Sequence, residues 1–223
     1  SPLCGGAFTT AGARDLSSYN ALTFWARASK AATLNTAGLG NDNTGTSKYE
    51  ALWSNLALTT TWKKYVIPVP FPERLSVERG LFFFAEGPEG TAAYDIWFDE
   101  IQFETVAGIS NPRPSMTTRT VSGFPGASVA IEGTRTIFNV GGTDQIIEHL
   151  PGYFTFLPSN QDVAVVENGI VRVVGGGQAM ITALLGDVPV AGSVTLNATP
   201  LPPAAPPTPT VPAAAVIALL SNA

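Results

Sequence analysis

The chain reads ALTFWARA over Ala21–Ala28. The even-numbered residues of this stretch are all apolar, whereas the odd-numbered positions include Thr23, Trp25 and Arg27. Because successive side chains of a β-strand point to opposite faces, this alternation predicts a strand with one face in a hydrophobic core. Trp25 and Arg27 then share the opposite face, where they leave the core or line the far side of a sheet.

Similar segments recur along the chain and predict an all-β fold. In the first part the predicted strands are Ala21–Ala28, Ala32–Leu39, Lys48–Leu58, Trp62–Val69, Arg79–Glu86 and Tyr94–Glu104. Farther along they are Ser128–Ile131, Arg135–Val140, Gln145–His149, Tyr153–Leu157, Val163–Val166, Ile170–Val174, Ala179–Leu184 and Ser193–Leu196. At Glu167–Gly169 an Asn-Gly pair between two apolar runs predicts a hairpin. Short strands at this spacing are typical of β-sandwiches.

The composition agrees with many short strands and argues against several classes of protein. The 223 residues include 22 Gly and 18 Pro, and 45% are apolar, which is too much for a disordered chain. The formal net charge of −5 argues against nucleic acid as a partner. One cysteine and one histidine exclude an intrachain disulfide framework and a Cys/His zinc site. No stretch reaches the roughly 20 apolar residues of a membrane-spanning helix.

The strand pattern predicts two β-sandwich domains. The first covers residues 1–108, and the second covers residues 109–198. We place the boundary at Ile109–Ser115, where Pro112 and Pro114 disfavour both helix and ladder pairing.

The C-terminal residues differ in composition from both predicted domains. Residues 199–212 are half proline, which predicts an extended, semi-rigid linker. Residues 213–223 contain the apolar run VIALL and are expected to begin a further domain. Since the chain also starts without methionine, we expect it to be a piece of a longer, multi-domain protein whose neighbouring domains are partners of this segment.

Part of the second region resembles bacterial immunoglobulin-like domains of the group 2 type. The residues that carry the resemblance are Pro158–Asn160, Val163–Val165, Asn168–Val171, Val173–Gly175 and Ala179–Ala183. The similarity covers roughly Pro158–Asn197. It implies an immunoglobulin-like sandwich that acts as a spacer or adhesive module on a bacterial surface protein.

The first region resembles carbohydrate-binding modules of the galactose-binding-like, jelly-roll type. The matching residues are Arg14–Tyr19, Leu22–Ala28, Trp62–Pro68 and Ile96–Ile101. The family usually has one or two strands before the turn that corresponds to Asp15–Tyr19, and only about thirteen residues precede it here. The resemblance therefore implies a jelly roll that is incomplete at its N-terminus.

Sugar binding needs flat apolar faces for pyranose C–H groups and a few fixed polar groups. All four tryptophans, Trp25, Trp53, Trp62 and Trp97, could supply such faces, and we take Trp25, Trp53 and Trp97 as the candidates for stacking. Trp97 shares a face with Asp95 and Asp99 if its strand is regular. The full set of candidate ligand-binding residues is Trp25, Arg27, Tyr49, Glu50, Trp53, Glu86 and Trp97. Arg27, Glu50 and Glu86 would orient sugar hydroxyls. The alternative for each tryptophan is a place in the core, above all for Trp62, which begins a strand and caps the core in this interpretation.

Binding of this kind requires no cofactor, but the resemblance implies a structural Ca²⁺ ion at Asp99. Hard oxygen ligands at a strand end suit calcium. The alternative is a carboxylate that accepts hydrogen bonds from backbone N–H groups. We assign no catalytic residue, because the only histidine, His149, has no nucleophile motif beside it and is expected at the surface or as a cap.

These observations predict non-catalytic binding of polysaccharide, with β-glucans favoured, by a surface or secreted protein in the extracellular space. One alternative is a structural or adhesive spacer with no sugar site. Another is a fragment of a glycoside hydrolase, which would need a carboxylate pair from Glu50, Glu86, Glu89 and Asp99 held at a fixed separation in a cleft.

Overall fold

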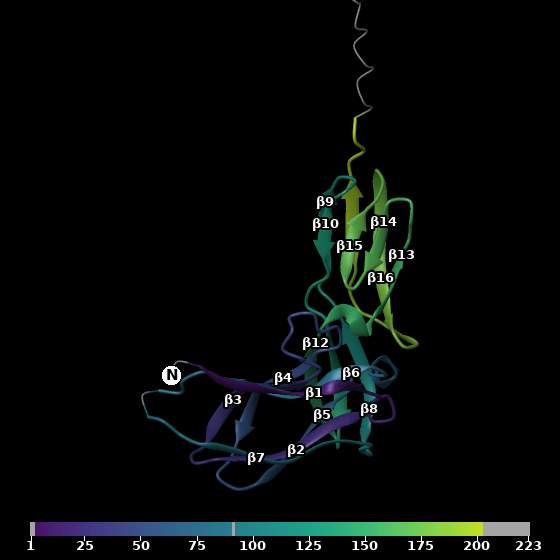
Figure 1. Ribbon diagram of the computed structural model, residues 1–223. Coiled ribbons are helices and arrows are strands. Elements are labelled where there is room, and N and C mark those ends of the chain that lie inside the picture. The colour runs from purple at the N-terminus through teal and green to yellow at the C-terminus, as the bar shows by residue number, and fades with distance from the viewer. Residues whose placement is uncertain (1–2, 91, 203–223) are drawn as a thin grey trace, which may run out of the picture.

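The protein is all-β, as the sequence predicts. The computed structural model describes residues 3–90 and 92–202 (Figure 1). The helical pieces in these ranges are two 3₁₀ turns, η1 (Pro72–Arg74) and η2 (Pro151–Tyr153). No helix within the same ranges has the length and apolar character to cross a membrane.

The strands fall into two bodies, one above the other in Figure 1, and the strands of residues 109–115 and 135–149 belong to the lower body with those of residues 4–104. The strands of the N-terminal part are β1 (Cys4–Arg14), β2 (Ala21–Ala28), β3 (Ala32–Leu39), β4 (Ala51–Leu58), β5 (Lys63–Pro68), β6 (Glu78–Glu86) and β7 (Ile96–Glu104). The others are β8 (Ile109–Ser115), β9 (Arg119–Gly123), β10 (Ser128–Ala130), β11 (Arg135–Val140), β12 (Thr143–His149), β13 (Thr155–Pro158), β14 (Ala164–Glu167), β15 (Ile170–Val173), β16 (Gly177–Leu185), β17 (Val188–Pro189) and β18 (Val194–Ala198).

The first sandwich packs the sheet β5-β2-β7 against the strands β1-β6-β3-β4 of a larger sheet. Phe24 of β2 lies at the centre, with ring centroids 5.4 Å from Tyr65 and 5.2 Å from Phe82. The rings of Phe84 and Phe98 also meet across the two sheets, at 4.8 Å. A layer of stacked and edge-on aromatic rings therefore forms the floor beneath the outer sheet.

The two faces of β2 differ as its alternation predicts. Leu22, Phe24 and Ala26 are completely buried, whereas Trp25 and Arg27 on the other face are partly exposed. The sequence pattern thus assigns the faces of this strand correctly.

Strand β7 contains a β-bulge that keeps its apolar side chains on the core face along its whole length. The sequence IWFDEIQFE breaks strict alternation, because Phe98 and Ile101 both pack against the core although they are three residues apart. The pairing with β2 slips by one residue at this point, and Glu100 adopts a φ of +47°. The extra residue lets apolar side chains face inward on both sides of the bulge while Trp97 and Asp99 face outward.

The second sandwich packs the sheet β10-β15-β14 against β13-β16-β18-β9. Strands β18 and β9 pair in parallel, and the other pairs of this body are antiparallel. Its core is aliphatic, with Val171, Ile181 and Leu196 completely buried. The predicted hairpin is confirmed: β14 and β15 are joined through Asn168 and Gly169, both with positive φ, as a type I′ turn requires.

One sheet crosses the predicted domain boundary. Strand β12 pairs with β4, with Glu148 opposite Leu52 and His149 opposite Ala51, so the sheet runs β1-β6-β3-β4-β12-β11-β8. The buried residues of the two bodies also form one hydrophobic cluster. The division at residue 108 stays a prediction, but the two regions share a sheet.

The expectation that Pro112 and Pro114 prevent ladder pairing is wrong. Both lie in β8, which pairs with β11 and places Pro114 opposite Thr136. Strand β8 is the last strand of the sheet, and an edge strand tolerates proline because the missing N–H faces away from the ladder. The register also slips between Ile137 and Asn139, which accommodates the irregular backbone beside Pro112.

Besides β8, strands β1, β9 and β17 are absent from the sequence prediction. Strand β1 is rich in Gly and Ala and almost entirely exposed, so its sequence carries no alternation of apolar and polar residues. It pairs with β6 and supplies one strand before the turn at Asp15–Ser17. The predicted linker is described only as far as Pro202, and the predicted start of a further domain, residues 213–223, lies outside the described residues.

Candidate functional site: an aromatic platform on the outer sheet

Three of the four tryptophans lie outside the hydrophobic core of the described chain. Trp25 is on β2, Trp97 is on β7, and Trp62 immediately precedes β5. Trp62 and Trp97 are 41% and 39% exposed. The interpretation of Trp62 as a cap on the core is therefore wrong.

The register of the outer sheet explains why these side chains meet. Arg27 is directly opposite Trp97 on β7, and the pairing of Ala26 with Lys63 on β5 places Trp62 opposite Arg27 on the other side. The Arg27 guanidinium carbon lies 5.1 Å from the ring centroid of Trp62 and 4.5 Å from that of Trp97. A cation between two indoles fixes both rings through cation–π attraction. We call Trp25, Arg27, Trp62 and Trp97 the aromatic platform.

Charged groups surround the platform on the same face. Lys64, opposite Trp25, forms an ion pair with Glu104 at 2.5 Å. The hydrogen bond from Lys64 lowers the pKa of the Glu104 carboxyl, and the Thr23 hydroxyl also donates to it. The Asp99 carboxylate accepts the backbone N–H of Glu100 at 2.8 Å. The face thus combines partly exposed rings with polar groups, which is the composition that a glycan surface needs.

A cavity of about 620 Å³ lies beside Trp97, at the open side of the first sandwich. Its wall includes Phe84, Phe98, Tyr94 and Glu86. The buried Glu86 carboxylate accepts the Tyr94 hydroxyl and the backbone N–H of Asn35, so its oxygens already have partners in the protein. The structure brings Trp97 and Glu86 to one cavity, but the hydrogen bonds of Glu86 are those of a structural carboxylate.

The remaining predicted ligand-binding residues lie elsewhere. Trp53 of β4 packs against the core, edge-on to Tyr65 at 6.2 Å. Tyr49 packs edge-on against Tyr153 and also contacts the core. Glu50 lines a different cavity, and burial raises the pKa of its carboxyl. The structure therefore does not bring Tyr49, Glu50 and Trp53 to the platform.

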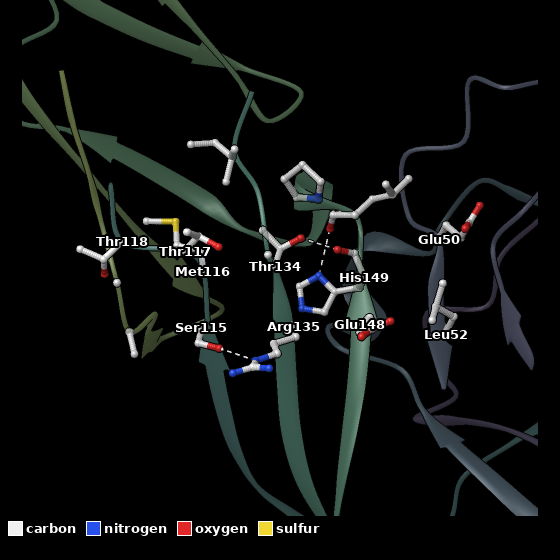
Figure 2. Close-up of a pocket in the computed structure, with 16 residues that line it drawn as sticks. Glu50, Leu52, Ser115, Met116, Thr117, Thr118, Thr134, Arg135, Glu148 and His149 are labelled. Atoms are coloured by element: carbon white, nitrogen blue, oxygen red, sulfur yellow. Dashed lines mark hydrogen bonds between the residues drawn. The ribbon is translucent and has the colours of Figure 1, made fainter. Parts of the chain in front are cut away.

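A second cavity, of about 720 Å³, lies at the ends of β4, β8 and β12, and Met116–Thr118 and Ala191–Gly192 complete its wall (Figure 2). His149, expected at the surface or as a cap, is buried here, and burial lowers its pKa to about 4. Its Nδ1 lies 3.0 Å from the Leu150 carbonyl oxygen and its Nε2 3.0 Å from the Thr136 hydroxyl. Ser115 Oγ accepts a hydrogen bond from Arg135, not from His149, so the cavity shows no serine–histidine pair.

The carboxylates considered for hydrolysis occupy three places. Glu50 is in the second cavity, Glu86 and Glu89 are beside Trp97, and Asp99 is on the outer face of β7. Glu89 accepts the backbone N–H of Thr33 at 2.6 Å. Among the described residues, no group of three His, Cys, Asp or Glu side chains is arranged to hold a metal ion. The surroundings of Asp99 offer no calcium ligand set, and calcium there stays a prediction.

Two residues of interest were missed by sequence reasoning. Trp62 completes the platform, and only the register of β5 against β2 reveals it. Glu78 of β6 is buried, and desolvation, followed by the charge of Asp42, raises its pKa to about 7. No local sequence signal marks Glu78, because its partners come from another loop.

Comparison with known proteins leaves the family open. No family model matches the chain, and no curated protein matches it. Among solved structures, a beta-1,2-glucanase from Parabacteroides distasonis is similar over 82% of this chain, with 10% sequence identity and a TM-score of 0.29. The chain spans 28% of the length of that structure. A similarity at this TM-score carries no argument about function, which rests instead on the residues described above.

Proposed function

We propose that the protein binds polysaccharide without catalysis, on the outer face of β5-β2-β7. The observation that carries the proposal is the pair of partly exposed indoles, Trp62 and Trp97, held on either side of Arg27. Indole rings stack on the apolar faces of sugar rings, and a rigid pair loses little conformational entropy on binding.

The expected affinity is modest. A few stacking contacts and solvent-exposed hydrogen bonds give dissociation constants on the order of micromolar to millimolar. Linked modules would raise the effective affinity through multivalency. The proposal includes β-glucans as the first ligands to test and a location outside the cell, in line with the resemblance to jelly-roll binding modules and to immunoglobulin-like domains of bacterial surface proteins.

A spacer function is the second candidate, and one observation favours it. The buried residues of the two sandwiches form one continuous hydrophobic cluster, and three residues, Met116–Thr118, lead from β8 into β9 of the second sandwich. A rigid rod of this kind would hold neighbouring domains apart whether or not the platform binds sugar. The two functions are compatible, and binding experiments separate the first from the second.

Affinity electrophoresis and titration calorimetry against β-glucans, xylans and mannans test the proposal. Trp62→Ala and Trp97→Ala should each weaken binding about 10- to 100-fold while leaving the melting temperature within a few degrees, because both rings lie outside the core. Trp53→Ala is the matched control: it removes a ring that packs against Tyr65, so it should lower stability rather than affinity.

The outcomes separate the alternatives. Wild-type protein that binds no polysaccharide, neutral or acidic, supports the spacer alone. Release of reducing sugar from the same panel would instead support a hydrolase fragment.

A further inference from the structure

Two indoles contact the guanidinium group of Arg27. Those of Trp62 and Trp97 lie at 5.1 Å and 4.5 Å from the guanidinium carbon. The group carries five N–H donors in a planar fork, and because its Nε is buried, a ligand would pair with the terminal Nη1 and Nη2 atoms. The two rings also remove water from the cation, so its charge is less well solvated than that of a surface arginine.

The side-chain nitrogens of Arg27 have no hydrogen-bond or ion-pair partner in the part of the chain that the structure describes. Its Nε is buried and unpaired, a feature shared with Arg74 and Arg119. Arg74 nevertheless donates through Nη2 to the Thr155 hydroxyl. Arg119 forms an ion pair with Glu132. Within the described residues Arg27 forms neither a hydrogen bond nor an ion pair, which distinguishes it from the other two.

The neighbouring cation on this face already has a partner. Lys64, opposite Trp25, is paired with Glu104. Asp99 accepts the Glu100 N–H. Arg27 is therefore a partly desolvated cation at the centre of the proposed binding face, and leaving such a group unpaired costs free energy.

We propose that Arg27 makes the platform selective for acidic polysaccharides, in which a sugar ring carries a carboxylate. This inference rests on the proposed function. The two oxygens of a uronate carboxylate match the N–H fork of a guanidinium group, and charge-assisted pairs are about twice as strong as neutral hydrogen bonds. The sugar ring then stacks on Trp62 or Trp97. A neutral sugar would leave the cation with hydroxyl groups only.

Polygalacturonate and its highly methyl-esterified form test the inference, because esterification removes the charge and keeps the sugar backbone. The wild-type protein should bind the free acid about tenfold more tightly than the ester in titration calorimetry at constant ionic strength. Arg27→Gln should bring the two affinities within about twofold. Arg27→Lys keeps the charge without the fork and should give an intermediate ratio.

A second variant should raise the affinity for the free acid instead of lowering it. Asp99 is on the same face as Arg27, two residues along β7 from Trp97, and its charge opposes an incoming carboxylate. Asp99→Asn keeps an oxygen for the Glu100 N–H and should raise affinity for the free acid about two- to threefold. Melting curves of each variant confirm that the fold is retained.

The ligand comparison needs no variant, so it remains decisive if a substitution unfolds the protein. Equal wild-type affinity for acid and ester, or a preference for the acid that survives Arg27→Gln, would overturn the inference. Binding of neutral polysaccharides without preference overturns the inference and leaves the proposed function intact. Failure to bind any polysaccharide, neutral or acidic, overturns both.

Discussion

The two sandwiches share an architecture and differ in what they expose. All four tryptophans belong to the first, and two of them are exposed around Arg27 on its outer sheet. The second exposes Leu157, Ile170 and Met180 and a single ring, Phe124, but it contains no tryptophan. Because one architecture supports such different surfaces, the outward-facing residues determine whether a sandwich binds a ligand or only spaces its neighbours.

The two cores also differ in their content of aromatic residues. The first is built on aromatic rings around Phe24, and the second on aliphatic side chains such as Ile181 and Leu196. Rings have few rotatable bonds, so an aromatic layer makes a rigid floor under the platform. The comparison predicts that substitutions in the first core weaken binding at the platform and that substitutions in the second core do not.

The largest expected effect is that of Phe24→Ala. The substitution removes a ring that contacts Tyr65, Phe82 and Phe98, and it should lower the free energy of unfolding by about 3–5 kcal/mol. Urea denaturation followed by tryptophan fluorescence measures the loss. Polysaccharide affinity should fall as well, since β2 carries both Phe24 and Arg27.

Leu196→Ala in the second sandwich is the control for that experiment. It should also destabilise, by about 2–5 kcal/mol, because the side chain is completely buried. Affinity in native buffer should stay that of the wild type. Equal loss of affinity in both variants would contradict the assignment of binding to the first sandwich.

Much of this fold is predictable from local sequence. Alternation in ALTFWARA assigns both faces of β2, and Asn168-Gly169 predicts the hairpin between β14 and β15, because each signal is contained in a few adjacent residues. Strand β8 is predicted wrongly for a physical reason. Whether Pro112 and Pro114 interrupt a ladder depends on whether the strand lies at a sheet edge, and that is a property of the topology.

The next prediction concerns the pH dependence of stability, to which two buried groups, Glu78 and His149, contribute. The folded-state pKa of Glu78 is raised to about 7, so the folded state binds a proton more tightly than the unfolded state does, and stability falls as pH rises from about 4.5 to about 7. The folded-state pKa of His149 is lowered to about 4, so stability is lost as pH falls from about 6.5 to about 4. The two slopes oppose each other between about pH 4.5 and 6.5.

Single substitutions should reveal how each group contributes to the change of unfolding free energy with pH. Glu78→Gln should raise the free energy of unfolding by about 2–3 kcal/mol at pH 8, where the wild-type carboxylate is buried and charged. The same variant should gain stability more steeply with rising pH between 4.5 and 6.5, because the opposing contribution of Glu78 is gone. His149→Gln should show the reverse slope. Urea denaturation of the three proteins from pH 4 to pH 8 measures these differences, and parallel profiles would contradict the assignment.

Gly169→Ala changes the second sandwich at its hairpin. Gly169 has a φ of +73°, and a Cβ there would lie 2.1 Å from Pro151 Cγ. The backbone strain and the contact should together lower the free energy of unfolding by about 1–2 kcal/mol. Polysaccharide affinity should not change. Ser128→Ala, on the edge strand β10 of the same sheet, provides a control with little expected effect on stability.

The candidate site is less predictable than the fold. The sequence indicates that Trp25, Arg27 and Trp97 face outward, because each sits in an alternating strand. It does not indicate that Trp62 joins them, because that depends on the pairing of β5 with β2, nor that Trp53 packs against Tyr65. The bulge at Glu100 is partly readable, since the spacing of Phe98 and Ile101 breaks the period of two.

The smallest expected effects come from two surface ion pairs, one on each sandwich. Arg172 and Glu167 are both more than 60% exposed and lie 3.3 Å apart, so Glu167→Gln should cost at most a few tenths of a kcal/mol. Glu104 is half as exposed and also accepts the hydroxyl of the buried Thr23, so Glu104→Gln should cost about 1 kcal/mol. Urea denaturation at low and high salt distinguishes them: added salt should erase the cost of Glu167→Gln and leave most of that of Glu104→Gln, because partial burial limits screening. Equal costs for the two substitutions would mean that the charged groups around the platform are no more ordered than those of the second sandwich.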